Sequence, residues 1–245
     1  MAQQDKAYST VAPITNVALA LEALDRSMQR TANLPGLVGF YGPSGYGKSF
    51  SATYAANSFR AYYIACKSTS TKKSILKSIL LEMGVPAIGN IDDLREQVEE
   101  QLVLSQRPLI IDEADYLIDK GLIPLVRDIF DATDAAIMLI GEEKMPAKLK
   151  RIERMHGRFL VWEPAQPATL QDAHHLARVY CRDIQVADDL LAEVHRLSQG
   201  SVRRISVNLD LIRTAALRDG NADMDLKAWG KRSFFTGEAP ARRLA

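Results

Sequence analysis

The sequence predicts an α/β domain built on a parallel sheet of five strands, with helices on both faces of the sheet, followed by a small all-helical domain. Five short apolar runs alternate with stretches of helical periodicity, which is typical of strand–helix–strand units. Beyond Pro164 and Pro167 only helical periodicity remains. The 245 residues, 47% of them hydrophobic and 25% charged, suffice for one such domain and a smaller appendage.

The expected strands are the apolar runs at 37–41, 61–66, 109–111, 135–140 and 159–162. An amphipathic helix over 13–30 precedes them, and further helices are expected from Phe50, around 75–83, over 94–102 and over 118–130. Helices over about 169–183, 187–198, 201–219 and 223–232 would form the second domain. We therefore expect an N-terminal helical arm at 1–33, an α/β domain at 34–166, a helical domain at 167–232 and a flexible tail at 233–245.

The stretch GPSGYGKS directly after the first strand fits the pattern GxxxxGK[ST]. Its glycines permit dihedrals that turn backbone N–H groups inward at a helix N-terminus, which makes a site for phosphate. Lys48 is expected to reach the β- and γ-phosphates of ATP, and Ser49 to hold Mg²⁺ through its hydroxyl. The alternative is a glycine-rich turn before an ordinary helix. The predicted nucleotide-binding residues of this stretch are Gly42, Pro43, Ser44, Gly45, Tyr46, Gly47, Lys48, Ser49 and Phe50.

Two carboxylates follow the third strand in the stretch RPLIIDEAD. Parallel strands present their carboxyl ends to a ligand at one edge of the sheet. Asp112 is expected to complete the Mg²⁺ site, and Glu113 to orient and deprotonate the attacking water. Asp115 is expected to be the N-cap of a helix that begins near Tyr116. The alternative for Asp112 and Glu113 is a solvated loop after a core strand.

Charge is segregated along the chain although the net charge is only +1. Residues 26–81 hold eight basic and no acidic side chains, whereas residues 82–134 hold thirteen acidic and four basic ones. Lysines with Ser and Thr after the second strand suit contacts to a phosphate backbone that ignore base identity. No aromatic residues interleave with them, which favours duplex over single-stranded DNA. The alternative is a solvated helix face; the candidate DNA-binding residues are Lys67, Thr69, Lys72, Lys73 and Lys77.

The remaining composition excludes several classes of protein. No apolar run is long enough for a membrane span, and the N-terminus lacks the basic and apolar regions of a signal peptide, so a cytoplasmic protein is expected. Cys66 and Cys181 are interpreted as buried free thiols. The neighbours His174 and His175 point in different directions on a helix and are not expected to bind one metal ion.

Taken together, the loop, IIDEAD, AIMLIGEE, HGRF and GSVRR occur in an order and spacing that resemble an AAA+ ATPase over residues ~34 to 219. The segment LIGEEKMPAKLKRIERMHGRF and the compact size look most like the transposition ATPases, which are the B protein of Mu-like phages and related target-selection subunits of transposons.

The resemblance implies roles for three more residues. Arg203 matches the lid arginine that touches the γ-phosphate. Arg158 matches the arginine that such proteins insert into the neighbouring subunit's site, with Arg151 and Arg154 as alternatives. Glu142 stands at the catalytic position after the fourth strand where Asn, Thr or Gln is expected, so this chain departs from the family pattern there.

The resemblance implies an ATPase that uses ATP and Mg²⁺, oligomerises as a ring or helical filament on duplex DNA, and delivers that DNA to a transposase. It would act in the cytoplasm of a bacterial cell or a phage-infected host. Longer phage relatives carry an N-terminal helix-turn-helix domain, for which this chain has no room, so DNA contact is expected from the ATPase domain. A helicase-loader-type ATPase of DNA replication and a secretion or signalling ATPase without nucleic acid remain the alternatives.

Overall fold

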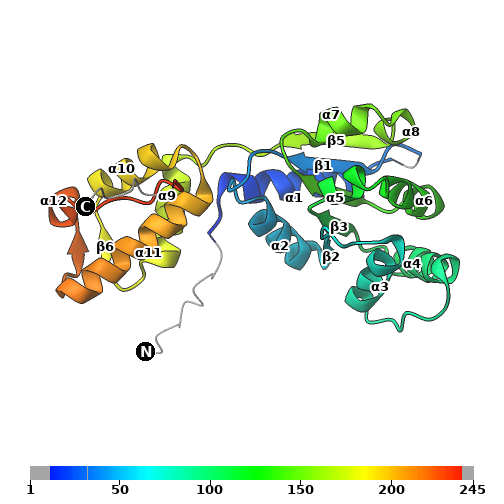
Figure 1. The fold of residues 1–245 in the computed structure, drawn as a ribbon, viewed down its shortest axis with the longest axis horizontal. Helices are drawn as coiled ribbons and strands as arrows, with labels where there is room; N and C mark the ends of the chain where they lie inside the picture. The colour runs from blue at the N-terminus through cyan, green and yellow to red at the C-terminus, as the bar shows by residue number, and fades with distance from the viewer. Residues whose placement is uncertain (1–11, 32, 239–245) are drawn as a thin grey trace, which may run out of the picture. The chain divides into compact units, whose positions relative to one another are not determined.

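The computed structural model describes residues 12–31 and 33–238. Contacts divide the chain into two compact units. One is the α/β unit, Asn16–Ser44 and Lys48–Ala165; the other, the C-terminal unit, contains Gly45–Gly47 and the residues from Gln166 onward. Figure 1 labels the elements of both units. Within the described ranges no helix is long and apolar enough to cross a membrane.

The sheet of the α/β unit has five parallel strands in the order β2-β3-β4-β1-β5. All residues of β3 and β4 are buried, which requires cover on both faces of the sheet. The predicted fold class is thus confirmed, and each predicted strand exists with small shifts at its ends. The strands are β1 (Leu37–Tyr41), β2 (Tyr62–Ala65), β3 (Leu109–Asp112), β4 (Ile137–Gly141) and β5 (Phe159–Pro164).

Eight helices of the described ranges connect or flank these strands (Figure 1). They are α1 (Thr15–Met28), α2 (Lys48–Phe59), α3 (Lys72–Met83), α4 (Ile91–Ser105), α5 (Asp115–Asp119), α6 (Ile123–Thr133), α7 (Met145–Lys150) and α8 (Glu153–His156). The apolar faces of α3, α4 and α6 pack into one core with β2, β3 and β4. The helix α1, from the predicted N-terminal arm, is tied to this unit because the Ser27 hydroxyl donates to the carbonyl of Gly36 at 2.6 Å.

The single helix predicted over 118–130 is wrong, because the chain forms two helices there, α5 and α6. Gly121 between them has a φ of 65°, which only the left-handed region provides. Pro124 then lies in the first turn of α6, where its missing N–H costs nothing. A continuous apolar pattern conceals this break because both helices bury their apolar residues in the same core.

The C-terminal unit is mainly helical, with α9 (Leu170–Tyr180), α10 (Asp188–Ser198), α11 (Val202–Asp219) and α12 (Leu226–Trp229). It also contains a two-stranded parallel sheet of β6 (Gln185–Val186) and β7 (Asp223–Met224). The helix predicted over 223–232 is therefore shorter, and its first residues pair as a strand. Cys181, predicted inside a helix, ends α9; it and Cys66 are buried free thiols, as predicted. The predicted tail lies partly outside the described residues.

The packing of β1 gives a stability prediction at Gly39. A Cβ added there would meet ring atoms of Trp162 at 2.5 and 2.6 Å, and Trp162 is itself stacked on Phe159 with 4.0 Å between ring centroids. Gly39→Ala should therefore lower the free energy of unfolding by about 1–3 kcal/mol, measured by urea denaturation. Gly157→Ala is the control, since a Cβ there meets nothing within 4 Å. Equal stability of the two variants would contradict this packing.

Candidate nucleotide-binding site

Three of the predicted catalytic residues, Lys48, Glu113 and Glu142, lie at the carboxyl edge of the sheet, whereas Arg158 precedes β5 at the opposite edge. Tyr41 pairs with Gly141 and Ala65 pairs with Asp112, so the ends of four strands reach this edge in register. The loop residue Gly42 follows β1, and its N–H donates to the carbonyl of Gly141 at 3.4 Å. Asp112 ends β3 and Glu142 follows β4. The edge thus carries the phosphate-binding loop and three carboxylates, including Glu113.

Lys48 is the first residue of α2, at the end of the phosphate-binding loop. Its Nζ donates to the carbonyls of Gly42 at 2.7 Å and Pro43 at 2.9 Å, so the ammonium lies inside the loop. Burial lowers the pKa of Lys48, and the charges of Asp112 and Glu113 oppose that shift. The ammonium and the N-terminus of α2 suit a phosphate chain, and Gly45 and Gly47 have the positive φ that a phosphate-binding loop requires.

Asp112 is 4% exposed and holds both of its carboxylate oxygens in hydrogen bonds. The Tyr63 hydroxyl donates to Oδ2 at 2.9 Å, and the backbone N–H of Glu113 donates to Oδ1 at 2.8 Å. Burial first and the charge of Asp112 second raise the pKa of Tyr63, so Tyr63 remains a neutral donor. Sequence reasoning missed Tyr63, because only the strand order places β2 beside β3.

Glu113 faces solvent beside Asp112 in an unusual backbone conformation. Its φ is 56°, a region that non-glycine residues rarely occupy and that is more common at functional sites. Partial desolvation beside the sheet edge, followed by the charge of Asp112, raises the pKa of Glu113, whereas Lys48 lowers it. An exposed carboxylate with a raised pKa, next to the phosphate-binding loop, is suited to accept a proton from water.

The chemistry of the donor set fits Mg²⁺. Ser49 is exposed in the first turn of α2 and offers a hydroxyl, and Asp112 offers a carboxylate at the same edge of the sheet. Hydroxyl, carboxylate and phosphate oxygens are the ligands that Mg²⁺ takes in nucleotide sites.

The predicted N-cap role of Asp115 is wrong. The helix α5 begins at Asp115, and its N-cap position, Ala114, makes no side-chain cap bond. The Asp115 carboxylate instead accepts the backbone N–H of Glu142 at 2.6 Å and the ammonium of Lys148 at 3.1 Å. A buried carboxylate that finds two donors on the β4–α7 segment is more stable there than at its own helix end.

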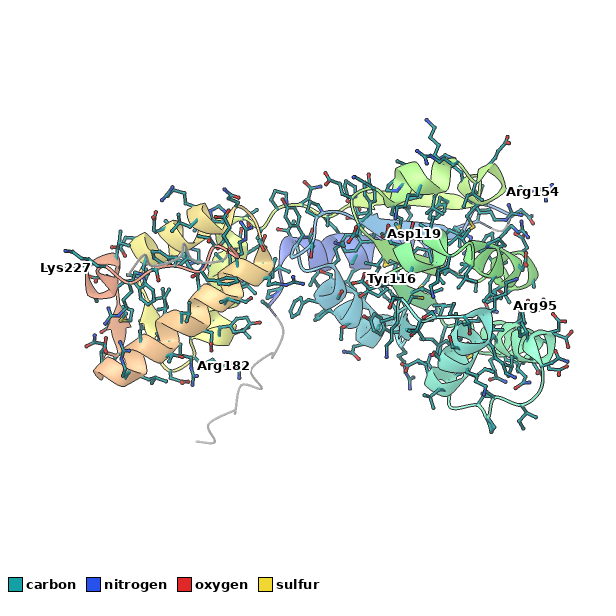
Figure 2. All side chains as sticks on the ribbon, viewed as in Figure 1. Arg95, Tyr116, Asp119, Arg154, Arg182 and Lys227 are labelled. Atoms are coloured by element: carbon teal, nitrogen blue, oxygen red, sulfur yellow. The ribbon has the colours of Figure 1, made fainter. Side chains whose placement is uncertain are left out.

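The three arginines named for the neighbouring subunit differ in their partners. Arg158 forms a two-pronged ion pair with Asp131, through Nε and Nη2 at 2.5 Å each, and also donates to the Arg154 carbonyl. Arg151 and Arg154 are exposed, and Figure 2 labels Arg154 at the surface of α8. Arg158 therefore forms a salt bridge within this chain, directly before β5.

Arg203 lies at the start of α11 in the C-terminal unit, with an exposed side chain. Its backbone N–H donates to the carbonyl of Gly45, a residue of the same unit, at 3.1 Å. Ser201 caps α11 by accepting the N–H of Arg204. The γ-phosphate role of Arg203 stays a prediction.

The candidate DNA-binding residues are all exposed, on the turn after β2 and on α3. The Ser70 N–H donates to the Lys67 carbonyl at 2.9 Å, and Thr71 caps α3 with a reciprocal bond to Ser74. The structure adds Lys120 to this group, because its Nζ donates to the carbonyl of Ser70 at 3.0 Å. The apolar residues Ile75, Leu76, Ile79 and Leu80 of α3 are buried in the core, whereas the lysine side chains of this helix are exposed. These residues, the basic loop surface, are Lys67, Thr69, Lys72, Lys73, Lys77 and Lys120.

Comparisons with known proteins agree with this geometry. Residues 32–149 match a family model described as AAA domain. No curated protein matches the chain. Among solved structures, Cdc6p of Pyrobaculum aerophilum has a TM-score of 0.61 at 14% identity, over 84% of this chain and 62% of that one. The Aeropyrum pernix ORC1 protein, solved in complex with DNA, has a TM-score of 0.61 at 17% identity, over 87% of this chain and 62% of that one.

A bacterial motor has a similar fold. The RuvB Holliday junction branch migration motor of Thermotoga maritima has a TM-score of 0.58 at 16% identity, over 87% of this chain and 66% of that one. The chain thus spans less than two thirds of the length of these solved structures, and at such identities the likeness concerns the fold. Residues 32–149 are thus similar to an AAA domain, and the chain shares its α/β fold with these solved structures.

Proposed function

We propose that this protein is an ATP-dependent, non-sequence-specific DNA-binding ATPase that oligomerises on duplex DNA and delivers it to a transposase. The observation that carries the DNA-binding part is the basic loop surface. Its side chains are exposed, it contains no acidic residue, and it lies on the unit that also carries Lys48, Asp112 and Glu113. Such a surface contacts phosphates and is indifferent to base sequence.

ATP hydrolysis follows from the residues at the sheet edge. The loop binds the phosphate chain through backbone N–H groups and Lys48, whose ammonium exchanges the carbonyls of Gly42 and Pro43 for phosphate oxygens. Ser49 and Asp112 would hold Mg²⁺, which would supply positive charge against the charge that develops on the phosphates. Glu113 orients the attacking water and takes its proton as the water oxygen bonds to the γ-phosphorus; the bond from that phosphorus to the bridging oxygen breaks, and ADP and inorganic phosphate are released. Tyr63 keeps the Asp112 carboxylate in one orientation.

Assembly completes the site in this proposal. An arginine from a second copy adds positive charge beside the γ-phosphate, where it stabilises the transition state. Arg154 and Arg151 suit this role better than Arg158, because Arg158 would first have to leave its ion pair with Asp131. Arg203 serves as the γ-phosphate contact of the C-terminal unit. We place the protein in the cytoplasm, where its DNA substrate is found.

A second candidate is a loader-type ATPase of DNA replication, favoured by the likeness to Cdc6p and to the ORC1 protein bound to DNA. The two candidates share ATP-dependent DNA binding and differ in the partner protein. A pull-down with this protein as bait separates the two candidates. Purified transposase and a purified replicative helicase hexamer are each offered to it with ATP and duplex DNA. Retention of the helicase alone would replace transposition by loading.

The DNA interaction is tested by Lys72→Ala combined with Lys73→Ala. Both side chains are exposed near the start of α3, so all duplex sequences should bind more weakly by similar factors. Each lysine–phosphate interaction that the substitutions remove should reduce the slope of log affinity against log salt by about 0.9. Gel-shift titration at several salt concentrations measures this, and nucleotide binding by the isolated subunit should be unchanged.

The matched control is Lys227→Ala combined with Lys231→Ala, which removes two exposed charges from the C-terminal unit. This control should keep the wild-type slope. A folded Lys72/Lys73 variant with an unchanged slope would remove the nucleic-acid argument and favour a secretion or signalling ATPase.

A further inference from the structure

Asp115 connects the segment after β3 to the segment after β4. Its carboxylate is 11% exposed, and Oδ2 accepts the backbone N–H of Glu142 at 2.6 Å. Oδ1 accepts the ammonium of Lys148, from α7, at 3.1 Å. Nothing in the catalytic steps described above uses this carboxylate, although it lies two residues beyond Glu113.

Lys148 holds Asp115 in this orientation. The same ammonium also donates to both oxygens of Asp119, at 2.7 and 2.9 Å, and Figure 2 labels Asp119 on α5. Hydrogen bonds to Asp119 and Asp115 raise the pKa of Lys148, so it stays charged. The ammonium thus joins α7 to both ends of α5.

The backbone at Gly141 and Glu142 has no room to shift toward Asp115. A Cβ on Gly141 would meet Oδ2 of Asp115 at 2.5 Å and Sδ of Met145 at 2.4 Å, and Met145 is fully buried. Asp115 therefore lies in close contact with this backbone, and a charged acceptor makes the bond to the Glu142 N–H a strong one.

The position of the Glu142 carboxylate depends on this bond because one nearby charge, Lys48, attracts the carboxylate and another, Glu113, repels it. Glu142 lies close enough to Lys48 to affect the pKa of that ammonium, and close enough to raise the pKa of Glu113. Like charge at Glu113 repels the Glu142 carboxylate, so the end of β4 needs a fixed backbone to keep it at the site.

We propose that Asp115 is a positioning residue for ATP hydrolysis. It fixes the main chain at Glu142 so that this carboxylate stays within electrostatic range of Lys48 and Glu113, and Lys148 holds Asp115 in place. Asp115 itself touches neither nucleotide nor water in this role. The inference rests on the proposed ATPase activity and adds a residue that acts on it through Glu142.

The test compares Asp115→Ala, Asp115→Asn, Lys148→Ala and, as the matched control, Asp119→Asn. Asp115→Ala should lower kcat at least tenfold with KM for ATP within twofold, because phosphate binding by the loop is untouched. Asp115→Asn keeps an acceptor for the Glu142 N–H and should lose less than Asp115→Ala. Lys148→Ala should lower kcat about threefold. Asp119→Asn, which has no bond to Glu142, should retain the wild-type kcat.

A double-mutant cycle with Glu142→Ala separates positioning from general damage. If Asp115 acts through Glu142, adding Asp115→Ala to the Glu142→Ala variant should lower kcat by less than a further twofold. Full additivity of the two effects, or wild-type kcat in the Asp115→Ala and Asp115→Asn variants, would overturn the inference. A wild-type protein without ATPase activity would instead reject the proposed function itself.

Discussion

Replacing Lys48 with alanine is expected to weaken ATP binding at least 100-fold. The ammonium lies inside the phosphate-binding loop, within 2.9 Å of two carbonyl oxygens. When ATP binds, phosphate oxygens would replace these carbonyl oxygens as partners of the ammonium. No other described basic side chain approaches these carbonyls through a hydrogen bond of the structure. Titration with a fluorescent ATP analogue measures the loss. If ATP is the assembly switch, DNA binding should be lost with it.

Two further measurements make this result decisive. Lys48→Met keeps the aliphatic stem, and agreement between the two variants would assign the loss to the charge. Thermal unfolding shows that the variants are folded. A Lys48→Ala protein that still coats DNA with wild-type salt sensitivity would show that ATP does not control assembly, even where nucleotide binding is lost.

The strands and the phosphate-binding loop could be predicted because local sequence decides them. Strands such as β3 and β4 are buried on both faces, so they stand out as apolar runs bounded by polar residues. The loop needs glycine where φ is positive, and Gly45 and Gly47 occupy those positions. The order of the strands, by contrast, depends on packing between segments far apart in the chain.

The missed residues are those whose partners depend on that strand order. Tyr63 finds Asp112 forty-nine residues away, and Asp115 finds Lys148 thirty-three residues away. From its place before a helix, Asp115 is expected to be an N-cap. Its carboxylate instead bonds to the Glu142 N–H and to Lys148, which lie far away in the sequence. The pair β6 and β7 was missed for the same reason, since strands of two residues leave no periodicity.

The arginine assignment came from resemblance to a family and not from local chemistry. The motif HGRF names Arg158, yet Asp131, twenty-seven residues earlier, pairs with it in this chain. The nearby Arg154 and Arg151 have exposed side chains and stay the better candidates for a second subunit's site. Alanine variants of all three, mixed with a subunit that lacks its own nucleotide site, would assign the role.

Glu113→Gln is expected to lower ATP turnover by about 10²–10⁴-fold, the range lost when a general base is removed. The amide that replaces the carboxylate keeps the shape of the side chain but cannot accept the proton from water. Asp112 retains both of its hydrogen-bond donors, so ATP and Mg²⁺ should bind as before. Assemblies on DNA should therefore persist with ATP, as electron microscopy and sedimentation would show.

The dependence of the rate on pH gives the same assignment a second test. Burial and Asp112 raise the pKa of Glu113, and a general base must be deprotonated to act. As the pH is lowered, turnover should therefore begin to fall at a higher pH than it would with an ordinary glutamate as the base. This decrease on the acidic side of the pH profile, the acid limb, should be absent in Glu113→Gln. The control is Glu143→Gln, an exposed glutamate of the neighbouring loop, which should keep wild-type turnover and the acid limb. Rapid turnover by Glu113→Gln would transfer the base role to another carboxylate of the sheet edge, of which Glu142 is the first to test.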